Sequence, residues 1–188
     1  MTFQSEHKTI ARIVKVNHAG EFGAIRIYRA QLWVARHIYP DAVPCLEETL
    51  GHELEHCARF ARAIPSRNAR PCRVMALWGN GGLILGLVTA LLGQRGIWIC
   101  TASVEKTVHR HLEDQLAFLV NRERELYNLI SAIQNDEMAH LRYAEDRPGT
   151  MTMWPRILSA GIAVVTETMI WLSTWGDSSR MTRKIAAD

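Results

Sequence analysis

The pattern of hydrophobic and polar positions is helical along most of the chain. Apolar residues recur at spacings of three and four over four long stretches, 8–37, 43–63, 97–120 and 123–145. This spacing is typical of helices that bury one face. Proline and glycine cluster between or beside these stretches, at 39–44, 64–71, 93–96 and 146–155. Because strand-like alternation of useful length is absent, the pattern predicts an all-α protein.

Two further segments are more apolar than these four. Residues 74–94 carry no charge, and residues 157–176 carry only Glu167. Each just reaches the roughly 20 residues of a membrane-spanning helix. However, WGNGG near the start of the first segment favours a bent or interfacial helix, and tryptophans near the segment ends resemble headgroup-level anchors. We expect apolar helices near 74–92 and 156–175 that touch a membrane surface, in preference to core helices or true spans.

Size, charge and cysteines narrow the class of protein. The 188 residues suit a single domain over 1–188, with a polar tail at 176–188. The net charge is +3, and Lys and Arg are spread along the chain, which argues against a nucleic-acid partner. The four cysteines form no Cys-x-x-Cys pair and are expected to be reduced core thiols. The chain starts without the pattern of a secretory signal, so we expect it to stay in the cytoplasm.

The sequence Glu-x-x-His occurs twice, as ELEH at 53–56 and EMAH at 137–140. Two such pairs alone exceed the number expected by chance only slightly. On a helix, however, both Glu53 and Glu137 fall within stripes of apolar residues, so both carboxylates are predicted to face inward. A buried carboxylate is costly unless it is protonated, paired or bound to a cation. The alternative is that these residues lie on solvated helix faces.

Two more glutamates repeat this anomaly. Glu21 and Glu105 lie in apolar stripes, each 32 residues before the glutamate of a Glu-x-x-His pair. In an antiparallel helical hairpin, residues at one level lie symmetrically about the turn, and the two midpoints fall at 37 and 121, next to predicted breaks. Two such hairpins would form a four-helix bundle whose core holds four carboxylates and two imidazoles. That set of ligands suits two iron or manganese ions.

The residues match a known family at this point. VNHAGEFGAIRIYRAQ (16–31), CTASVEKTVHRHLEDQ (100–115) and DEMAHLRYA (136–144), with the apolar segment 70–93, resemble the demethoxyubiquinone hydroxylase family of ubiquinone biosynthesis. The similarity runs from about residue 12 to 175. It implies a ferritin-like bundle with additional membrane-interfacial helices. The implied ligands are Glu21 and His56 for one iron and Glu105 and His140 for the other, with Glu53 and Glu137 bridging.

The resemblance also implies an activity. The family members are O2-dependent monooxygenases that hydroxylate the ring of a demethoxyubiquinol or demethoxyubiquinone, as 3-demethoxyubiquinol 3-hydroxylases. The implied cofactors are two iron ions, with O2 as co-substrate and an external electron donor that the sequence does not identify. The implied partners are a polyprenyl quinol or quinone and the cytoplasmic face of the cell membrane, with peripheral attachment. A homo-oligomer or partner proteins of ubiquinone biosynthesis stay open.

The chain departs from the family in two places. Where relatives have His-His-Tyr after the third glutamate, this chain has Arg110-His111-Leu112, and Arg142 replaces an acid that many relatives have. His111 and Asp136 are candidates for residues that support a ligand without binding metal. For Asp136, an ordinary helix-surface role is an equal alternative.

Two other classes of protein share parts of this pattern. A ferritin-like iron-handling or peroxide-reducing protein would use the same ligands but should lack the apolar segments. A non-enzymatic, membrane-associated helical protein would hold no metal.

Overall fold

Every regular element in the described part of the chain is a helix, which confirms the predicted fold class. The computed structural model describes residues 3–147 and 153–174, and no strand occurs among them. The helices are α1 (Phe3–Ile38), the short 3-10 helix η1 (Pro40–Ala42), α2 (Val43–Ser66), α3 (Met75–Leu91), α4 (Gln94–Leu119), α5 (Arg124–Glu145) and α6 (Met153–Thr174).

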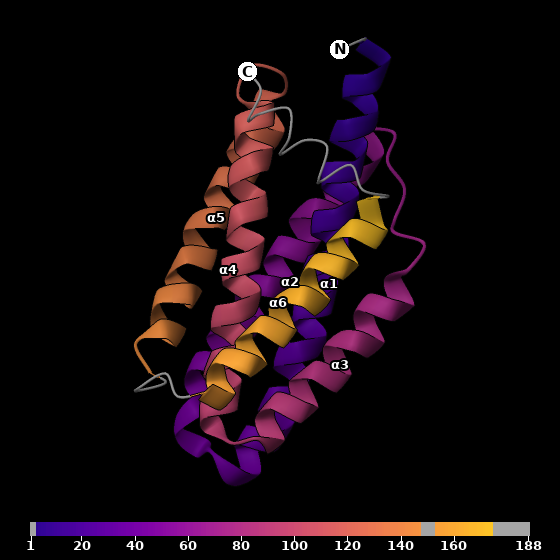
Figure 1. Cartoon of the computed structure of the whole chain (residues 1–188). Coiled ribbons are helices and arrows are strands. Elements are labelled where there is room, and N and C mark those ends of the chain that lie inside the picture. Colours follow the sequence, from indigo (N-terminus) through magenta and orange to yellow (C-terminus); the bar gives the residue numbers. More distant parts are fainter. Residues whose placement is uncertain (1–2, 148–152, 175–188) are drawn as a thin grey trace.

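The four long helices form the predicted ferritin-like bundle. α1 packs along α2, and α4 packs along α5, so each pair is an antiparallel hairpin. The two apolar helices lie outside this bundle. α3 runs along α1, and α6 crosses obliquely over α4 and α1 (Figure 1). The bundle interior is therefore closed by α2 and α5 on one side and by α3 and α6 on the other.

The two hairpin turns lie near residues 37 and 121, the midpoints predicted from the spacing of the glutamates. η1 connects α1 to α2, and residues 120–123 connect α4 to α5. The Glu123 carboxylate caps α5 by accepting a hydrogen bond of 2.8 Å from the backbone N–H of Leu126. Such a cap satisfies one of the free N–H groups at a helix start and contributes about 1 kcal/mol. A charged stretch with no glycine or proline can therefore still mark a turn.

Some helix ends differ from the sequence expectation by a few residues. α1 begins at Phe3 and α4 at Gln94, both earlier than expected. α2 continues through Pro65 to Ser66, although the break was expected from residue 64. Proline is tolerated there because only the final turn loses a hydrogen bond. Gly93, with φ +104, makes the sharp turn between α3 and α4.

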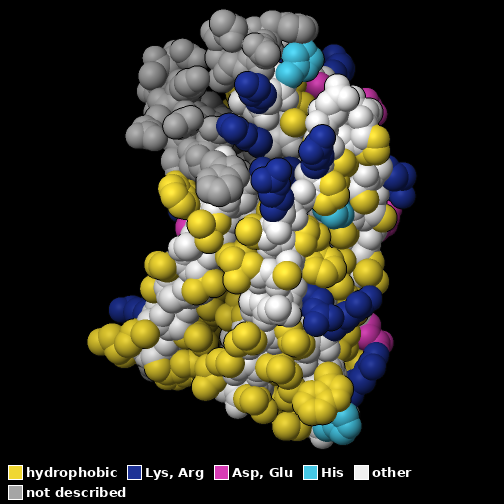
Figure 2. Space-filling model, turned by 90° about the vertical axis from the view of Figure 1, so that its right-hand side faces the viewer, with side chains coloured by type: hydrophobic (Ala, Val, Ile, Leu, Met, Phe, Trp, Pro, Cys, Tyr) yellow, Lys and Arg dark blue, Asp and Glu magenta, His cyan; other side chains and the backbone are white. Residues whose placement is uncertain are grey.

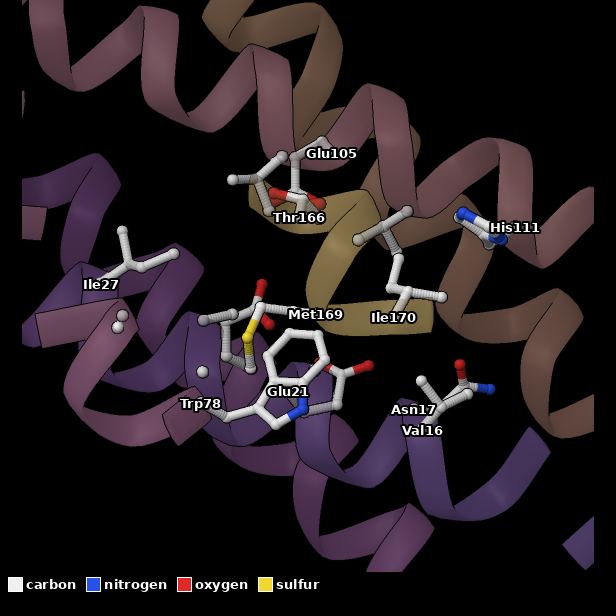
Figure 3. A pocket seen from close by; sticks show the side chains of 18 of the residues that line it. Val16, Asn17, Glu21, Ile27, Trp78, Glu105, His111, Thr166, Met169 and Ile170 are labelled. Atoms are coloured by element: carbon white, nitrogen blue, oxygen red, sulfur yellow. The ribbon is translucent and has the colours of Figure 1, made fainter. Parts of the chain in front are cut away.

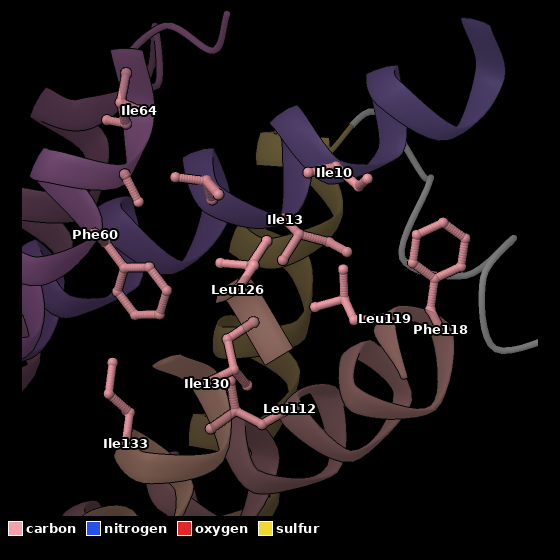
Figure 4. Packing of buried hydrophobic residues seen from close by; sticks show 12 residues of the cluster. Ile10, Ile13, Phe60, Ile64, Leu112, Phe118, Leu119, Leu126, Ile130 and Ile133 are labelled. Atoms are coloured by element: carbon pink, nitrogen blue, oxygen red, sulfur yellow. The ribbon is translucent and has the colours of Figure 1, made fainter. Parts of the chain in front are cut away.

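A compact apolar cluster closes the bundle at the end that holds the α4–α5 turn. It draws side chains from α1, α2, α4 and α5, which meet across the bundle axis (Figure 4). Phe60, Leu126 and Ile130 are fully buried within it. Burial of this kind stabilises a fold by about 1.5–3 kcal/mol per large side chain. The cluster fixes the relative height of the two hairpins, and with it the level at which their polar residues meet.

Gly82 and Gly86 of α3 pack against α1. A Cβ on Gly82 would lie 2.4 Å from the Gly23 carbonyl oxygen, and one on Gly86 would lie 2.4 Å from the Ile27 carbonyl oxygen. Only glycine permits so close an approach of two helix backbones. The sequence suggested that the glycines of WGNGG, Gly79, Gly81 and Gly82, favour a bent or interfacial segment. α3 is a continuous helix over Met75–Leu91, and close packing against α1 accounts for Gly82.

The outer faces of α3 and α6 are unusually apolar. Exposed residues on these two helices and the turn after α3 are Leu77, Ile84, Val88, Leu91, Leu92, Met153, Trp154, Ile157, Val164, Val165 and Trp171. Figure 2 shows hydrophobic side chains gathered over the lower half of this side, with Lys and Arg along its margins. α6 is long and apolar enough to cross a membrane, and only 28% of its apolar window is buried. The expected tail at 176–188 and Trp175 lie outside the described residues.

Candidate metal centre

The six residues singled out by the sequence are all buried and lie at one level of the bundle. Their exposed fractions are 7% for Glu21, 1% for Glu53, 1% for His56, 3% for Glu105, 2% for Glu137 and 7% for His140. One glutamate comes from each of the four long helices. Both imidazoles come from α2 and α5, one turn after a glutamate.

The six side chains form two overlapping groups. The first is Glu21, Glu53, His56 and Glu137, and the second is Glu53, Glu105, Glu137 and His140. Within each group, one ligand atom per residue lies within 4.8 Å of all the others. Glu53 and Glu137 belong to both groups. The geometry is therefore that of two adjacent cation positions with two shared carboxylates and one imidazole each.

Both imidazoles turn the same nitrogen toward the carboxylates. His56 Nδ1 lies 3.1 Å from Glu137 Oε1 and 3.7 Å from Glu21 Oε2. His140 Nδ1 lies 3.3 Å from Glu137 Oε2 and 3.7 Å from Glu53 Oε1. In each ring the other nitrogen, Nε2, points away from the centre. An imidazole arranged in this way can bind a cation through Nδ1 and donate a hydrogen bond through Nε2–H.

Protons balance the charge of this cluster when no metal is bound. Burial, aided for Glu53 and Glu105 mainly by the nearby Glu137 carboxylate, raises the pKa of Glu21, Glu53 and Glu105. Glu137 behaves differently: burial opposes its charge, but hydrogen bonds from both imidazoles hold its pKa well below the usual range. Although burial also disfavours a charged His56, hydrogen bonds to Glu137 and Glu21 raise its pKa to about 10. The site is built to hold positive charge.

One oxygen of the cluster lacks a hydrogen bond. Glu53 Oε1 is buried, and no hydrogen-bond donor is found for it among the described residues, His140 Nδ1 lying 3.7 Å away. Leaving a buried acceptor unsatisfied costs about 1–3 kcal/mol. A cation at the shared position would satisfy this oxygen, and four carboxylates would offset the charge of two divalent ions. Oxygen-rich sites with two imidazoles and no thiolate suit iron or manganese, so the donor set fits the expected metal.

A tyrosine from the first hairpin holds a carboxylate of the second. Buried Tyr28 on α1 donates a hydrogen bond of 2.7 Å to Glu105 Oε1 on α4. Burial and the Glu105 carboxylate raise the pKa of Tyr28 well above its ordinary value, so the hydroxyl keeps its proton. Tyr28 therefore orients Glu105 through one of its two carboxylate oxygens. Tyr28 lies two turns after Glu21 on the same face of α1, but periodicity alone does not reveal its contact with Glu105.

An apolar cavity of about 230 Å³ reaches the carboxylates from the side of α3 and α6. All four glutamates of the cluster line it, together with apolar residues of α1, α3, α4 and α6. Figure 3 shows Glu21 and Glu105 on opposite sides of the cavity, with Trp78 and Met169 beside Glu21. Leu77 and Val165 also line it, and these are 47% and 52% exposed. The cavity thus extends from the carboxylates toward the surface between α3 and α6.

Polar side chains of α1 and α4 also line this cavity. Asn17 on α1 and Gln115 on α4 exchange two hydrogen bonds of 2.7 and 3.1 Å. His111 lines the cavity and places its Nε2 at 2.9 Å from Glu167 Oε2 on α6. Arg110 also pairs with Glu167. His111 therefore links α4 to α6, and no hydrogen bond to the six clustered residues is found for it.

The opposite side of the cluster is polar. Asp136 Oδ2 lies 3.1 Å from His56 Nε2, so this aspartate contacts an imidazole of the cluster from outside. His52 Nδ1 lies 2.9 Å from His140 Nε2. Sequence reasoning weighed Asp136 but missed His52. Sequence position could have revealed His52, because both His52 and Asp136 directly precede the glutamate of a Glu-x-x-His pair. His18 and His109 belong to neither group of possible ligands.

Comparison with known proteins gives one family over most of the chain. Residues 8–173 match the family described as "Ubiquinone biosynthesis protein COQ7". The "NADPH-dependent 3-demethoxyubiquinone 3-hydroxylase, mitochondrial" of Dictyostelium discoideum is 34% identical over 172 residues, covering 90% of this chain and 78% of that protein. The "3-demethoxyubiquinol 3-hydroxylase" of Rhodospirillum rubrum is 32% identical over 164 residues, covering 87% and 77%. The "5-demethoxyubiquinone hydroxylase, mitochondrial" of Saccharomyces cerevisiae is 30% identical, covering 85% and 75%.

Proposed function

Because the chain belongs to the ubiquinone biosynthesis protein COQ7 family, we propose that it is a 3-demethoxyubiquinol 3-hydroxylase, a di-iron monooxygenase. The observation that carries this proposal is the contact between two features. A buried cluster able to hold two metal ions forms the inner end of an apolar cavity that extends toward an apolar surface. This combination fits an oxidation of a lipid-soluble ring.

The metal ligands in this proposal follow the two overlapping groups. Glu21 and His56 would hold one iron, and Glu105 and His140 would hold the other. Glu53 and Glu137 could serve both ions, since each belongs to both groups. The unpartnered Oε1 of Glu53 supports a bridging role for that residue.

The proposed reaction replaces a ring C–H bond with C–OH. One atom of O2 enters the ring, and the other leaves as water after taking up two electrons and two protons. When bound, the two iron ions supply the activation of O2. The Dictyostelium discoideum relative is named as NADPH-dependent, which makes NADPH the first electron source to test for this chain.

The protein's own contribution is to place the ring and exclude water. Apolar side chains such as Val104 and Ile170 line the cavity beside the carboxylates. A cavity of about 230 Å³ suits a substituted ring rather than a long isoprenoid tail. The tail would leave between α3 and α6, where Leu77 and Val165 are exposed. Tyr28 holds Glu105 in place during this positioning.

The same argument supports peripheral attachment to a membrane. The exposed apolar faces of α3 and α6 lie where the cavity reaches the surface, so contact with lipid would let the ring enter without crossing water. Lys and Arg side chains lie along the margins of this surface (Figure 2). Because basic margins favour the anionic cytoplasmic leaflet, we place the protein on the cytoplasmic face of a cell membrane.

Iron and quinone analyses test the proposal together. We expect two iron ions per chain in the wild-type protein and fewer in Glu53→Ala. We also expect a strain lacking the gene to accumulate a demethoxy quinone. Reintroducing the wild-type gene should remove this quinone, and reintroducing the Glu53→Ala gene should not. An iron-handling or peroxide-reducing protein would bind iron without changing the quinones. Absence of iron from both proteins would refute the oxygenase assignment.

A further inference from the structure

The two imidazoles of the metal centre have different partners on their outer side. His56 Nε2 faces the Asp136 carboxylate at 3.1 Å, whereas His140 Nε2 faces the His52 ring at 2.9 Å. The arrangement is otherwise reciprocal. Asp136 precedes Glu137 on α5 and contacts the imidazole of α2, and His52 precedes Glu53 on α2 and contacts the imidazole of α5. One position carries an acid and its counterpart carries a second imidazole.

The geometry indicates that His140 Nε2 carries the proton shared between His140 and His52. Nδ1 of His140 faces Glu137 and Glu53, so it must present a lone pair to bind a cation, and the ring proton then sits on Nε2. A buried N–H needs an acceptor, and His52 Nδ1 is the hydrogen-bond partner found for it among the described residues. The two ring planes are 18° from parallel, with centroids 5.1 Å apart. That separation fits rings joined edge to edge through one N–H···N hydrogen bond.

Building on the proposed metal ligands, we propose that His52 is a positioning residue for His140. Because His140 has an imidazole as its outer partner where His56 has the Asp136 carboxylate, the two metal positions are unequal. Outer partners of ligand imidazoles fix the tautomer and the ring orientation, and a carboxylate partner also raises the donor strength of the ring. An uncharged imidazole acceptor supplies the first effect with much less of the second. The position held by Glu21 and His56 is therefore the tighter one, and it fills first.

The surroundings of His52 fit an orienting role. His52 is half-buried on α2, four residues before His56, and its ring also lies near that of His56, with centroids 6.3 Å apart. Its own Nε2 carries the proton when Nδ1 accepts. The Asp136 side chain is 45% exposed, so water reaches its carboxylate. The pair thus places one charged and one uncharged acceptor at equivalent points around the centre.

Three substitutions at His52 separate orientation from charge. His52→Leu removes the acceptor, His52→Asn keeps an uncharged acceptor near the place of Nδ1, and His52→Asp supplies a carboxylate like that of Asp136. The metal-free full chain is titrated with Fe²⁺ without oxygen against a competing chelator. Mössbauer spectra of the loaded protein then report each iron separately, and circular dichroism reports the helical fold.

We expect two Fe²⁺ ions per wild-type chain, with a tighter first step. His52→Leu weakens the second step by about 10- to 100-fold, and His52→Asn restores it. His52→Asp narrows the gap between the two steps and brings the two Mössbauer signals closer. The mirror variant Asp136→Asn weakens the first step instead, so the two steps again draw closer.

Two results would overturn this inference. One is a His52→Leu protein that binds both ions as the wild type does, and the other is a folded His52→Leu protein in which both steps weaken equally. Either result leaves the proposed function standing, provided that the wild type binds two ions. If the wild type itself binds none, the metal assignment fails first.

Discussion

The two sides of the candidate metal centre differ in polarity. Toward α3 and α6, the carboxylates face an apolar cavity, and the surface beyond it is rich in exposed hydrophobic side chains. Toward α2 and α5, the imidazoles face His52 and Asp136, and Leu54 is the one large hydrophobic residue exposed on these two helices. The contrast teaches that one bundle can separate two tasks. Under the proposed function, substrate access would belong to the apolar side, and ligand orientation would belong to the polar side.

The largest expected effect comes from removing a carboxylate on the cavity side. Glu105→Ala deletes a proposed ligand and also leaves the Tyr28 hydroxyl without its acceptor. We expect hydroxylation to fall by more than about 100-fold with loss of iron. On the polar side, Asp136→Asn should cost only about 10- to 100-fold, because it acts through His56. Turnover and iron content of both variants measure the difference, and equal losses would contradict the division of tasks.

The next effect concerns the lipid-facing surface. Ile84 and Leu91 are 61% and 69% exposed on one face of α3. If each contributes about 1.5 kcal/mol to lipid contact, replacing both with Glu weakens vesicle binding by at least roughly 100-fold. Co-sedimentation with vesicles of mixed neutral and anionic lipid measures this.

The matched control is Leu54→Glu with Val120→Glu, at exposed positions away from α3 and α6. We expect this control protein to bind vesicles as the wild type does. Equal binding by all three proteins would show that the apolar side does not contact lipid.

A smaller effect is expected from narrowing the cavity. Gly20 lines it, and an added Cβ there would meet no atom within 4 Å. Gly20→Leu should therefore fill space without a clash at Cβ, raising KM for the quinone by about tenfold while leaving iron content unchanged. Gly51→Leu on α2 is the control, since it makes the same change at an exposed position that is equally free of neighbours. An unchanged KM in Gly20→Leu would place the ring elsewhere.

The smallest effect is a pH dependence of the metal-free protein. Glu21, Glu53 and Glu105 have raised pKa values, so unfolding releases their protons above about pH 4.5, and stability falls as the pH rises. His56 acts in the same direction, because its contribution is complete below its unfolded pKa of 6.5 and is lost as the pH passes about 10. Glu137, with a lowered pKa, contributes stability above about pH 4.5 that is lost only in acid.

Thermal melts between pH 6 and 9 measure this dependence. The expected slope is at most about 1.4 kcal/mol per pH unit for each proton released. Bound metal displaces the same protons, so the loaded protein should show a weaker decline. A metal-free protein that becomes more stable toward pH 9 would contradict the proposed charge balance.

The helices and their pairing were predictable from the sequence because they depend on local periodicity. Apolar stripes placed the long helices to within a few residues, and the equal spacing of Glu21 to Glu53 and of Glu105 to Glu137 indicated two hairpins. Burial of those glutamates followed from the same stripes. The turn near residue 121 was harder to place, because it depends on the Glu123 cap rather than on glycine or proline.

Contacts between helices were not predictable in the same way. The hydrogen bonds of Tyr28 with Glu105 and of His52 with His140 depend on the axial offset and rotation of packed helices. Periodicity gives only the face on which a residue lies. The close packing at Gly82 and Gly86 was not predicted for a related reason: a glycine that bends a helix and one that admits a neighbouring backbone look the same in sequence.

The glycine contact between α3 and α1 has a mechanical consequence. At Gly82 and Gly86 no side chain separates the two backbones, so there is no compliant layer to absorb a displacement. α3 and α1 are therefore expected to move as one unit. Since α1 also carries Glu21, a displacement of the outer helix would shift a carboxylate of the candidate centre.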